Sequence, residues 1–509
     1  MAFLEGRPAG ALTVARAAFA VAFAVASASL VLTCAIGRGT YRPEPWLEDL
    51  DALEAHMGRV YANLEWSVER RGIDLPELDH TTRELIRSAG SDGEAAESLE
   101  RFVEAFRDPH FGIERRRSPW IAWAFRLYGD DPSHSSGSVS LPARTSGRDA
   151  CEALGYRDRG HGFDFRVEDL PGWWPLQGDG PFPAGTFSLP DGRRAGLLRI
   201  GHFGENGYRA ECVEAWESER HLAPCDDDCL SAFRRRASDA LAGRVARRVE
   251  ALDAAGASLL VVDVTGNGGG SEWVDPVTRI FSARPLRAMR ATAVRVPRAI
   301  EPIESRLAAV EAALADSAVP GTTRELLEVA RERLAALLAE ARAPCERSPL
   351  WHGQAASCSQ LFQAPDYATG VFDWLPPGAL AGVADSIAEE LYSPFGRDVP
   401  SGVWTGPLFV LADGGSASAT EAFIAMLKDN GAATVIGERT YGAGCGYLDG
   451  GLPLELPNSG LEVWMPDCAR FRIDGTNEIE GIDPDIPVPW SDLGGSERAR
   501  ALVAALARR

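Results

Sequence analysis

The chain has 509 residues, more than one compact domain usually contains, and this length predicts two or three lobes. Its hydrophobic fraction of 45% is normal for a soluble globular protein. The formal net charge is −21 and no cluster of Lys and Arg dominates. This balance argues against a nucleic-acid partner, because phosphate binding requires clustered positive charge.

The first 34 residues predict an export signal. Arginines precede an apolar run over residues 17–32, which is short for a membrane span and typical of a signal peptide. Two processing routes are open. Residues 26–28 (ASA) offer a cleavage site with small residues, whereas residues 31–34 (VLTC) resemble a bacterial lipoprotein box in which Cys34 is lipidated. An uncleaved anchor is the third possibility.

The cysteine count favours lipidation at Cys34. Of nine cysteines, the other eight form an even set suited to disulfides in an oxidising compartment. Cleavage after Ala28 would leave Cys34 as a lone thiol. Cys225 and Cys229 lie near His221, but three such residues are too few for a metal site, so disulfides are expected there and no metal. We therefore expect a cell-envelope protein, periplasmic or extracellular, whose membrane contact is limited to a lipid anchor or signal segment.

A helical lobe is expected next. Apolar residues recur at three- and four-residue steps over residues 46–64, which predicts an amphipathic helix. Capping-box patterns at Thr81 and Ser91 predict two more helices. The last of these ends before Pro109, because a residue that precedes proline is pushed out of helical geometry. His110 is thereby presented at a helix exit.

The middle of the chain predicts a parallel sheet. Residues 114–193 show no clean period and are interpreted as loops and short strands, without a clear PDZ domain. A strand at 196–203, a helix at 237–254 and a strand at 259–263 form a strand-helix-strand unit. The glycines at 268–270 follow, and they allow the backbone to approach a ligand closely.

A helical hairpin is expected over residues 300–342, where two apolar stripes are separated by Val319-Pro320-Gly321. It either covers the site as a lid or packs against the catalytic lobe.

Ser418 lies at a turn between a predicted strand at 408–411 and a predicted helix at 421–430. Such a turn exposes a hydroxyl beside the unpaired N–H groups of a helix start, and an acyl-transfer nucleophile needs both. An ordinary serine-rich helix cap is the alternative. Beyond residue 444, short runs at 452–456 and 461–465 predict antiparallel strands.

The segments 259–270 and 407–444 resemble the two signature segments of the carboxyl-terminal processing (tail-specific) serine peptidases, whose clan includes the tricorn core protease. The resemblance covers residues 44–113 and 194–490. It implies an α/β fold with a crotonase-like spiral catalytic domain. The chain then divides into a signal region (1–34), an N-terminal helical lobe (44–113), an irregular or small β region (114–193) and a catalytic lobe (194–490) with the hairpin inserted at 300–342.

The resemblance also implies roles for individual residues, following the tricorn-like branch. Ser418 would be the nucleophile, His110 the base, and Glu478 the acidic partner, with Glu480 as its neighbouring alternative in the terminal segment 478–488. Backbone N–H groups of Gly268, Gly269 and Ala419 would form the oxyanion hole. Ser416 either assists catalysis or is a turn residue.

The sequence departs from the family at the lysine base. In the dyad members that lysine lies 25 positions after the serine, where this chain has Ala443. The only lysine, Lys428, is ten residues past Ser418 on the same predicted helix, about 15 Å along the axis and out of reach.

Two functions stay open without that lysine. The first is an exported serine endopeptidase that cleaves proteins or peptides by a Ser/His/Glu mechanism without a cofactor. The second is an inactive relative that binds a ligand or a protein. The presence of His110 and Glu478 favours the first.

Overall fold

The computed structural model describes residues 41–114, 141–178, 180–218, 224–270, 273–364, 370–372, 374–376, 378–392, 399–448 and 451–508. The expectations for residues 1–34, including lipidation at Cys34, lie outside the described residues. Within the described ranges, no helix is both long enough and apolar enough to span a bilayer.

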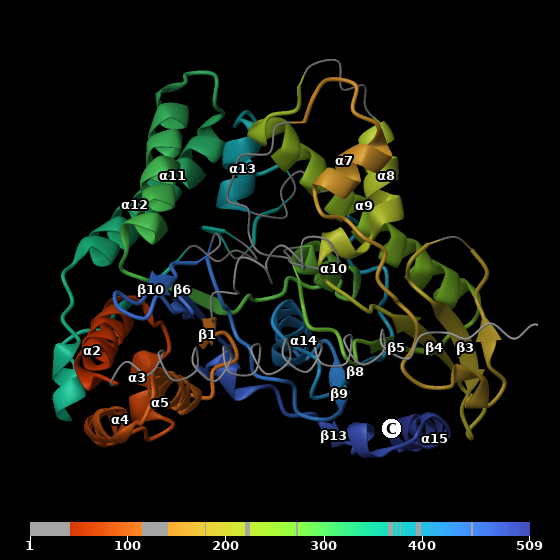
Figure 1. The fold of residues 1–509 in the computed structure, drawn as a ribbon. Coiled ribbons are helices and arrows are strands. Elements are labelled where there is room, and N and C mark those ends of the chain that lie inside the picture. Colours follow the sequence, from red (N-terminus) through yellow and green to blue (C-terminus); the bar gives the residue numbers. More distant parts are fainter. Residues whose placement is uncertain are drawn as a thin grey trace, which may run out of the picture.

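A seven-stranded sheet forms the centre of a mixed α/β fold, with the strand order β13-β9-β8-β5-β4-β3-β2 (Figure 1). Five neighbouring strands are parallel, and β3 and β2 complete the sheet in antiparallel fashion. The strands are β2 (Trp174–Pro175), β3 (Ala184–Ser188), β4 (Arg194–Arg199), β5 (Leu259–Asp263), β8 (Leu408–Ala412), β9 (Thr434–Gly437) and β13 (Ile486–Pro487). The predicted strand-helix-strand unit and parallel pairing are confirmed at β4 and β5.

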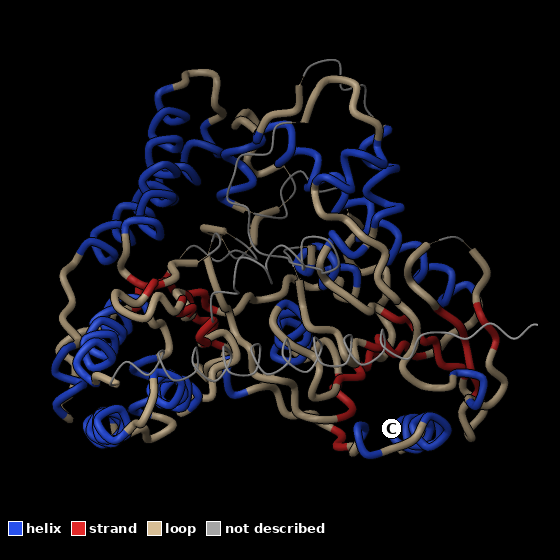
Figure 2. Tube along the Cα trace, viewed as in Figure 1, coloured by secondary structure: helices blue, strands red, loops and turns tan. Residues whose placement is uncertain are grey.

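Helices cover both faces of this sheet (Figure 2). Because successive side chains of a strand point to opposite faces, Val262 of β5 packs into one hydrophobic core and Val261 into another. The first core receives α9 (Asp227–Ala254), α10 (Val274–Ile280) and α14 (Ala419–Asp429), and the second receives α15 (Gly495–Leu506). Helix α9 begins ten residues before the predicted start, where the Asp226 side chain accepts a hydrogen bond from Cys229 N.

The N-terminal lobe consists of α2 (Pro43–Val60), α3 (Leu64–Glu69), α4 (Leu75–Ser88) and α5 (Asp92–Glu104). The helix start predicted at Ser91 is confirmed, since its side chain accepts from Glu94 N. The start predicted at Thr81 is wrong: Thr81 lies inside α4, whose N-cap is Asp74. The lobe shares a core with a small sheet of β1 (Gly112–Glu114), β10 (Leu454–Glu455) and β11 (Glu462–Trp464), the last two paired antiparallel as predicted.

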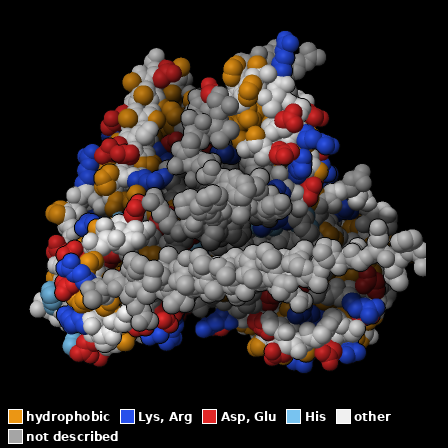
Figure 3. All heavy atoms as spheres, in the orientation of Figure 1, with side chains coloured by type: hydrophobic (Ala, Val, Ile, Leu, Met, Phe, Trp, Pro, Cys, Tyr) orange, Lys and Arg blue, Asp and Glu red, His pale blue; other side chains and the backbone are white. Residues whose placement is uncertain are grey.

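Two helical arms project on one side of the sheet (Figure 1). One is built from α11 (Pro297–Ala315) and α12 (Gly321–Arg342), which share a core with α13 (Asp385–Leu391). The other contains α7 (Gly147–Ala153), α8 (Arg209–Glu217) and the start of α9. Acidic, basic and hydrophobic side chains are mixed on both arms (Figure 3). A third sheet joins β6 (Arg290–Val294), β7 (Leu361–Gln363) and β12 (Cys468–Phe471).

The eight described cysteines form four disulfides, namely Cys151–Cys212, Cys225–Cys229, Cys345–Cys358 and Cys445–Cys468. The expectation that Cys225 and Cys229 serve as disulfide partners is therefore met by a bond between the two.

Candidate active site

The Ser418 backbone adopts a conformation that L-residues rarely occupy. Ser418 is the N-cap of α14, in the turn that follows β8, and has φ 56° and ψ −117°. A side chain at this φ is strained by about 1–3 kcal/mol, and such strain persists only where the surroundings enforce it. A serine on a strained strand-to-helix turn projects its hydroxyl at the sheet edge, the arrangement of a nucleophile elbow.

Glu421 holds this turn in place. Its buried carboxylate accepts a hydrogen bond from Ser418 N at 2.9 Å. It also accepts from Thr440 Oγ1 at 2.6 Å, and from Gly442 N and Ala443 N at 2.8 Å each. One side chain therefore ties the serine turn to the turn over residues 440–443, which contains the position of the family lysine.

Two of the three predicted oxyanion donors are available. The N–H groups of Gly268 and Ala419 have no acceptor among the described residues. In contrast, Gly269 N donates to Asn267 Oδ1 at 3.0 Å, so this N–H is already used. Gly269 has φ +97°, and a Cβ built on it would lie 2.8 Å from Ser418 Cβ, so only glycine allows this close approach.

His110 is positioned by the side chain of Asp108. This buried carboxylate accepts from His110 N at 3.1 Å, from Asn63 Nδ2 at 2.8 Å and from Tyr61 OH at 3.1 Å. Burial raises the pKa of Asp108, and the hydrogen bonds from Asn63 and from His110 oppose that shift. Asp108 therefore fixes the backbone from which His110 projects.

The imidazole of His110 is oriented by a main-chain carbonyl. Its Nδ1 lies 2.7 Å from the oxygen of Ala443. A carbonyl only accepts, so Nδ1 carries a proton, and in the neutral ring the lone pair is then on Nε2, where a general base needs it. Tyr447 packs edge-on against the ring at 5.5 Å between centroids, and its hydroxyl donates to His110 O. No hydrogen bond joins His110 to Ser418 in the described part of the chain.

Glu478 contacts an arginine instead of His110. Its Oε2 accepts from Arg470 Nε at 2.6 Å, and its buried Oε1 has no hydrogen-bond partner among the described residues. The pKa of Glu478 is raised above its ordinary value, mainly by burial. The charge of Arg470 opposes this shift, and the charge of Glu421 adds to it. Arg470 Nη2 also donates to Ser418 O at 2.9 Å and to Gly444 O at 2.8 Å. Glu478 is therefore linked to the Ser418 turn only through Arg470, which contacts both.

The two auxiliary candidates have structural contacts. Ser416 is buried, and its hydroxyl donates to Val264 O at 3.0 Å and accepts from Asp413 N at 3.1 Å, which ties the turn after β5 to the turn after β8. Glu480 accepts from Trp66 Nε1 and Arg71 Nε, each at 2.8 Å. Glu480 therefore joins the terminal segment to the helical lobe.

Comparison with known proteins identifies the family. Residues 230–488, just over half of the chain, match peptidase family S41. The chain belongs to peptidase family S41. The resemblance found in the sequence is thereby confirmed, and by family the chain is a serine peptidase.

Individual relatives match less closely. The chloroplastic carboxyl-terminal-processing peptidase 2 of Arabidopsis thaliana is 35% identical over 121 residues, which are 23% of this chain and 22% of that protein. The match thus spans about a fifth of that relative. Mature CPAF complexed with lactacystin covers 92% of this chain and 97% of its own, with a TM-score of 0.54 and 14% identity. Mature CPAF alone gives a TM-score of 0.52 at 16% identity, and the match covers 92% of this chain and 96% of the CPAF chain. At these identities the likeness to CPAF concerns the fold alone.

Two residues of this S41 site were missed in the sequence. Glu421 stands three positions after Ser418, and this S-x-x-E spacing is a capping-box signal that predicts its bond to Ser418 N. Arg470 carries no comparable signal, because its contacts to Ser418, Gly444 and Glu478 all depend on tertiary packing.

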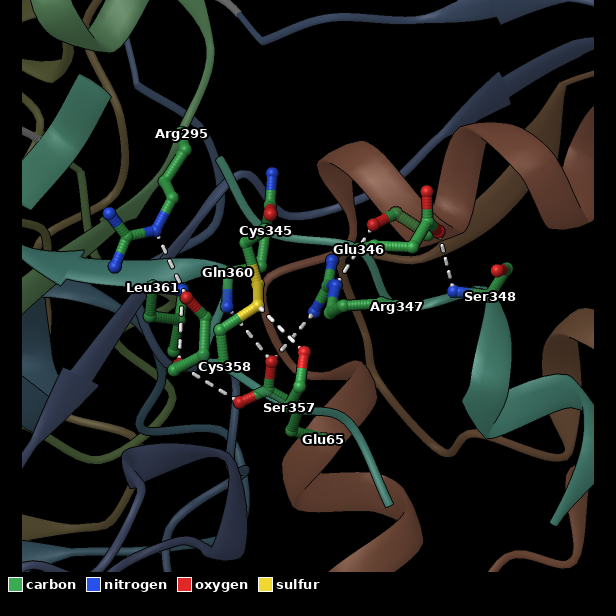
Figure 4. The surroundings of a disulfide bond; sticks show 12 residues. Glu65, Arg295, Cys345, Glu346, Arg347, Ser348, Ser357, Cys358, Gln360 and Leu361 are labelled. Carbon is green, nitrogen blue, oxygen red and sulfur yellow. Dashed lines mark hydrogen bonds and ion pairs between the residues drawn. A yellow bond between two sulfur atoms is a disulfide. The ribbon is translucent and has the colours of Figure 1, made fainter. Parts of the chain in front are cut away.

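A disulfide-closed loop attaches the helical lobe that carries His110 (Figure 4). Cys345–Cys358 closes it, and Arg347 within it is buried. The Arg347 guanidinium donates to Met57 O, Gly58 O and Tyr61 O at the end of α2. Glu65 of α3 lies 3.5 Å from Arg347 Nη1 and accepts from Gln360 N. Burial lowers the pKa of Arg347 to about 10.

Proposed function

We propose that the chain is an exported serine endopeptidase in which Ser418 attacks a peptide carbonyl of a protein substrate and His110 serves as general base. The observation that carries this proposal is the backbone of Ser418, a non-glycine residue at φ 56° and ψ −117°, together with the N–H groups of Gly268 and Ala419, which have no acceptor in the described part of the chain. A binding module gains nothing from such strain, whereas a nucleophile needs it to expose its hydroxyl.

The proposed reaction assigns each proton to an atom. As Ser418 Oγ forms a bond to the carbonyl carbon, its proton passes to His110 Nε2. The proton on Nδ1 stays there and keeps its hydrogen bond to Ala443 O. The negative charge on the former carbonyl oxygen is held by Gly268 N–H and Ala419 N–H. His110 Nε2–H then protonates the leaving amine, and a water molecule repeats the sequence to release the acyl group.

An inactive binding protein is the second candidate, and the lack of a hydrogen bond between Ser418 and His110 in the described structure favours it. Such bonds are often long in enzymes without substrate and tighten when substrate binds.

A fluorophosphonate probe separates the two candidates. We expect labelling of wild type at Ser418, none of Ser418→Ala, and labelling at least about 10⁴-fold slower for His110→Ala, because members of a catalytic set act as a unit. Circular dichroism should show all three folded. Absence of labelling in folded wild type, or equal rates in wild type and His110→Ala, would refute the mechanism.

We infer further that the central sheet and its helices are the crotonase-like catalytic lobe over residues 194–490, with 44–113 as the helical lobe and α11–α12 as an insertion. The four disulfides support export, because they form and persist in oxidising compartments. Residues 1–34 would provide the signal, and Cys34 the lipid anchor.

A further inference from the structure

The peptide between Ser418 and Ala419 has a defined partner at each end. Its carbonyl oxygen accepts from Arg470 Nη2 at 2.9 Å, in addition to the helical N–H groups of Glu421 and Ala422. Its N–H belongs to Ala419 and is one of the two proposed oxyanion donors. In a planar trans peptide the C=O and N–H point in opposite directions, so a group that fixes the oxygen also aims the N–H.

The partner at the oxygen carries a full positive charge. A cation bonded to a carbonyl polarises the whole peptide and makes its N–H a stronger donor, and this effect is larger in a dry site. Arg470 is 3% exposed, so water screens its charge little. Its charge is balanced by Glu478, which is itself fully buried and accepts from Arg470 Nε.

Arg470 also reaches the turn that orients His110. The same Nη2 atom that donates to Ser418 O donates to Gly444 O at 2.8 Å. Gly444 directly follows Ala443, whose carbonyl accepts from His110 Nδ1. This nitrogen atom is therefore a second tie, beside Glu421, between the Ser418 turn and the turn that orients His110.

We propose that Arg470 is a positioning residue of the catalytic site: it aims and polarises the Ser418–Ala419 peptide as an oxyanion donor, and Glu478 acts by holding Arg470 instead of contacting His110. This inference rests on the proposed function. It assigns Glu478 a role different from that of a triad carboxylate, and the two roles differ in their effect on the pH profile.

The test compares Arg470 with an arginine two residues further along the same segment. Arg472 pairs with Asp429 at the far end of α14, and no hydrogen bond joins it to the Ser418–Ala419 peptide in the described structure, so Arg472→Met removes a largely buried arginine ion pair without changing the partner of Ser418 O. The second-order rate constant of Ser418 with a fluorophosphonate is measured in the full chain, together with kcat and KM on fluorescein-labelled casein.

We expect Arg470→Met to lower the labelling rate constant and kcat by about 100-fold with KM little changed, because the Ala419 N–H loses its aim and polarisation; removing an oxyanion donor outright costs about 100- to 1000-fold. Arg472→Met should stay within about twofold of wild type. Glu478→Gln should lower the rate without moving the midpoint of the acid limb of the kcat/KM profile. Should Arg470→Met fail to fold, Arg470→Lys replaces it, with about a tenfold loss expected, because one ammonium cannot span Ser418 O, Gly444 O and Glu478 together.

The outcomes separate this inference from the proposed function. Wild type that folds and does not label at Ser418 overturns both. Wild type that labels, with the folded Arg470 variant as fast as Arg472→Met, overturns the inference alone. A shift of the acid-limb midpoint in Glu478→Gln would also overturn it, because that shift would mean that Glu478 acts on His110.

Discussion

The carbonyl oxygen of Ala443 accepts a hydrogen bond from Nδ1 of His110, with 2.7 Å between the two atoms. The position that matches the lysine of the dyad peptidases therefore orients a histidine in this chain. Under the proposed mechanism the base is His110 of the helical lobe, and the turn that contains Ala443 contributes only the carbonyl that orients it. Glu421 fixes that turn from the N–H side, through Gly442 and Ala443.

Restoring the lysine should therefore not raise activity. Ala443 is 4% exposed, and a lysine there would bring a cation close to the imidazole that must become positively charged. We expect Ala443→Lys to cleave labelled casein no faster than wild type and no faster than Ala443→Met, a control of similar bulk without charge. A gain of activity in Ala443→Lys that survives in the double variant with His110→Ala would identify a lapsed dyad enzyme and would favour the binding-module function.

The sequence was most informative where one segment determines its own structure. The strand at β5, the helix start at Ser91 and the serine turn after β8 each depend on local periodicity or capping, and each was predicted close to its observed place. The contacts of Glu478 and Arg470 were not predictable. They join residues of β12, the terminal segment and the serine turn, and only the folded chain brings these together.

The strain at Ser418 predicts a measurable gain in stability. Glycine adopts φ 56° without penalty, whereas alanine keeps the strain of the Cβ. After the entropy cost of glycine in the unfolded chain, we expect Ser418→Gly to be about 1 kcal/mol more stable than Ser418→Ala, a rise in Tm of roughly 1 °C by calorimetry for a chain of this length. Both variants lack the hydroxyl and should be inactive. Equal Tm values would argue that the turn is relaxed, and with it against the observation on which the proposed function rests.

Glu54 in the helical lobe should make stability fall as pH rises. Burial, and then hydrogen bonding and repulsion from Asp79, raise the pKa of Glu54 to about 9, while Arg83 lowers it and Asp51 raises it. Below the ordinary value near 4.5 both states bind the proton, and between that value and about 9 only the folded state does, so folding is progressively disfavoured as pH rises through this window.

Glutamine mimics the protonated form, so Glu54→Gln should reduce the fall in Tm between pH 5.5 and 8.5 by at least about 2 °C. Glu97→Gln, an exposed change in α5, is the control and should leave the fall unchanged. The same fall in both variants would show that Glu54 does not hold a proton in the folded lobe.

The mature N-terminus tests export. If residues 31–34 act as a lipoprotein box, mass spectrometry of the membrane fraction should find a chain that begins at an acylated Cys34, and Cys34→Ser should move the protein to the soluble fraction. A chain that begins at Ser29, or one that retains Met1, would rule out lipidation. Neither outcome would affect the assignment of Ser418.

The Cys445–Cys468 disulfide should matter for rate as well as stability. Cys445 follows Gly444, whose oxygen binds Arg470, and Cys468 begins the strand β12 that carries Arg470. This bond therefore ties the turn that orients His110 to the strand whose Arg470 donates to Ser418 O. Losing a native disulfide typically costs about 2–5 kcal/mol, and here it also frees the turn that orients His110.

We expect the double variant Cys445→Ser/Cys468→Ser to label with fluorophosphonate at least about tenfold more slowly than wild type at a temperature where both are folded, since small misplacements of catalytic groups are costly. The double variant Cys151→Ser/Cys212→Ser removes a disulfide from the α7–α8 arm and is the matched control. It should lower Tm and leave the labelling rate within about twofold. If both variants slow labelling equally, the effect comes from general destabilisation, and the catalytic turn does not depend on its disulfide.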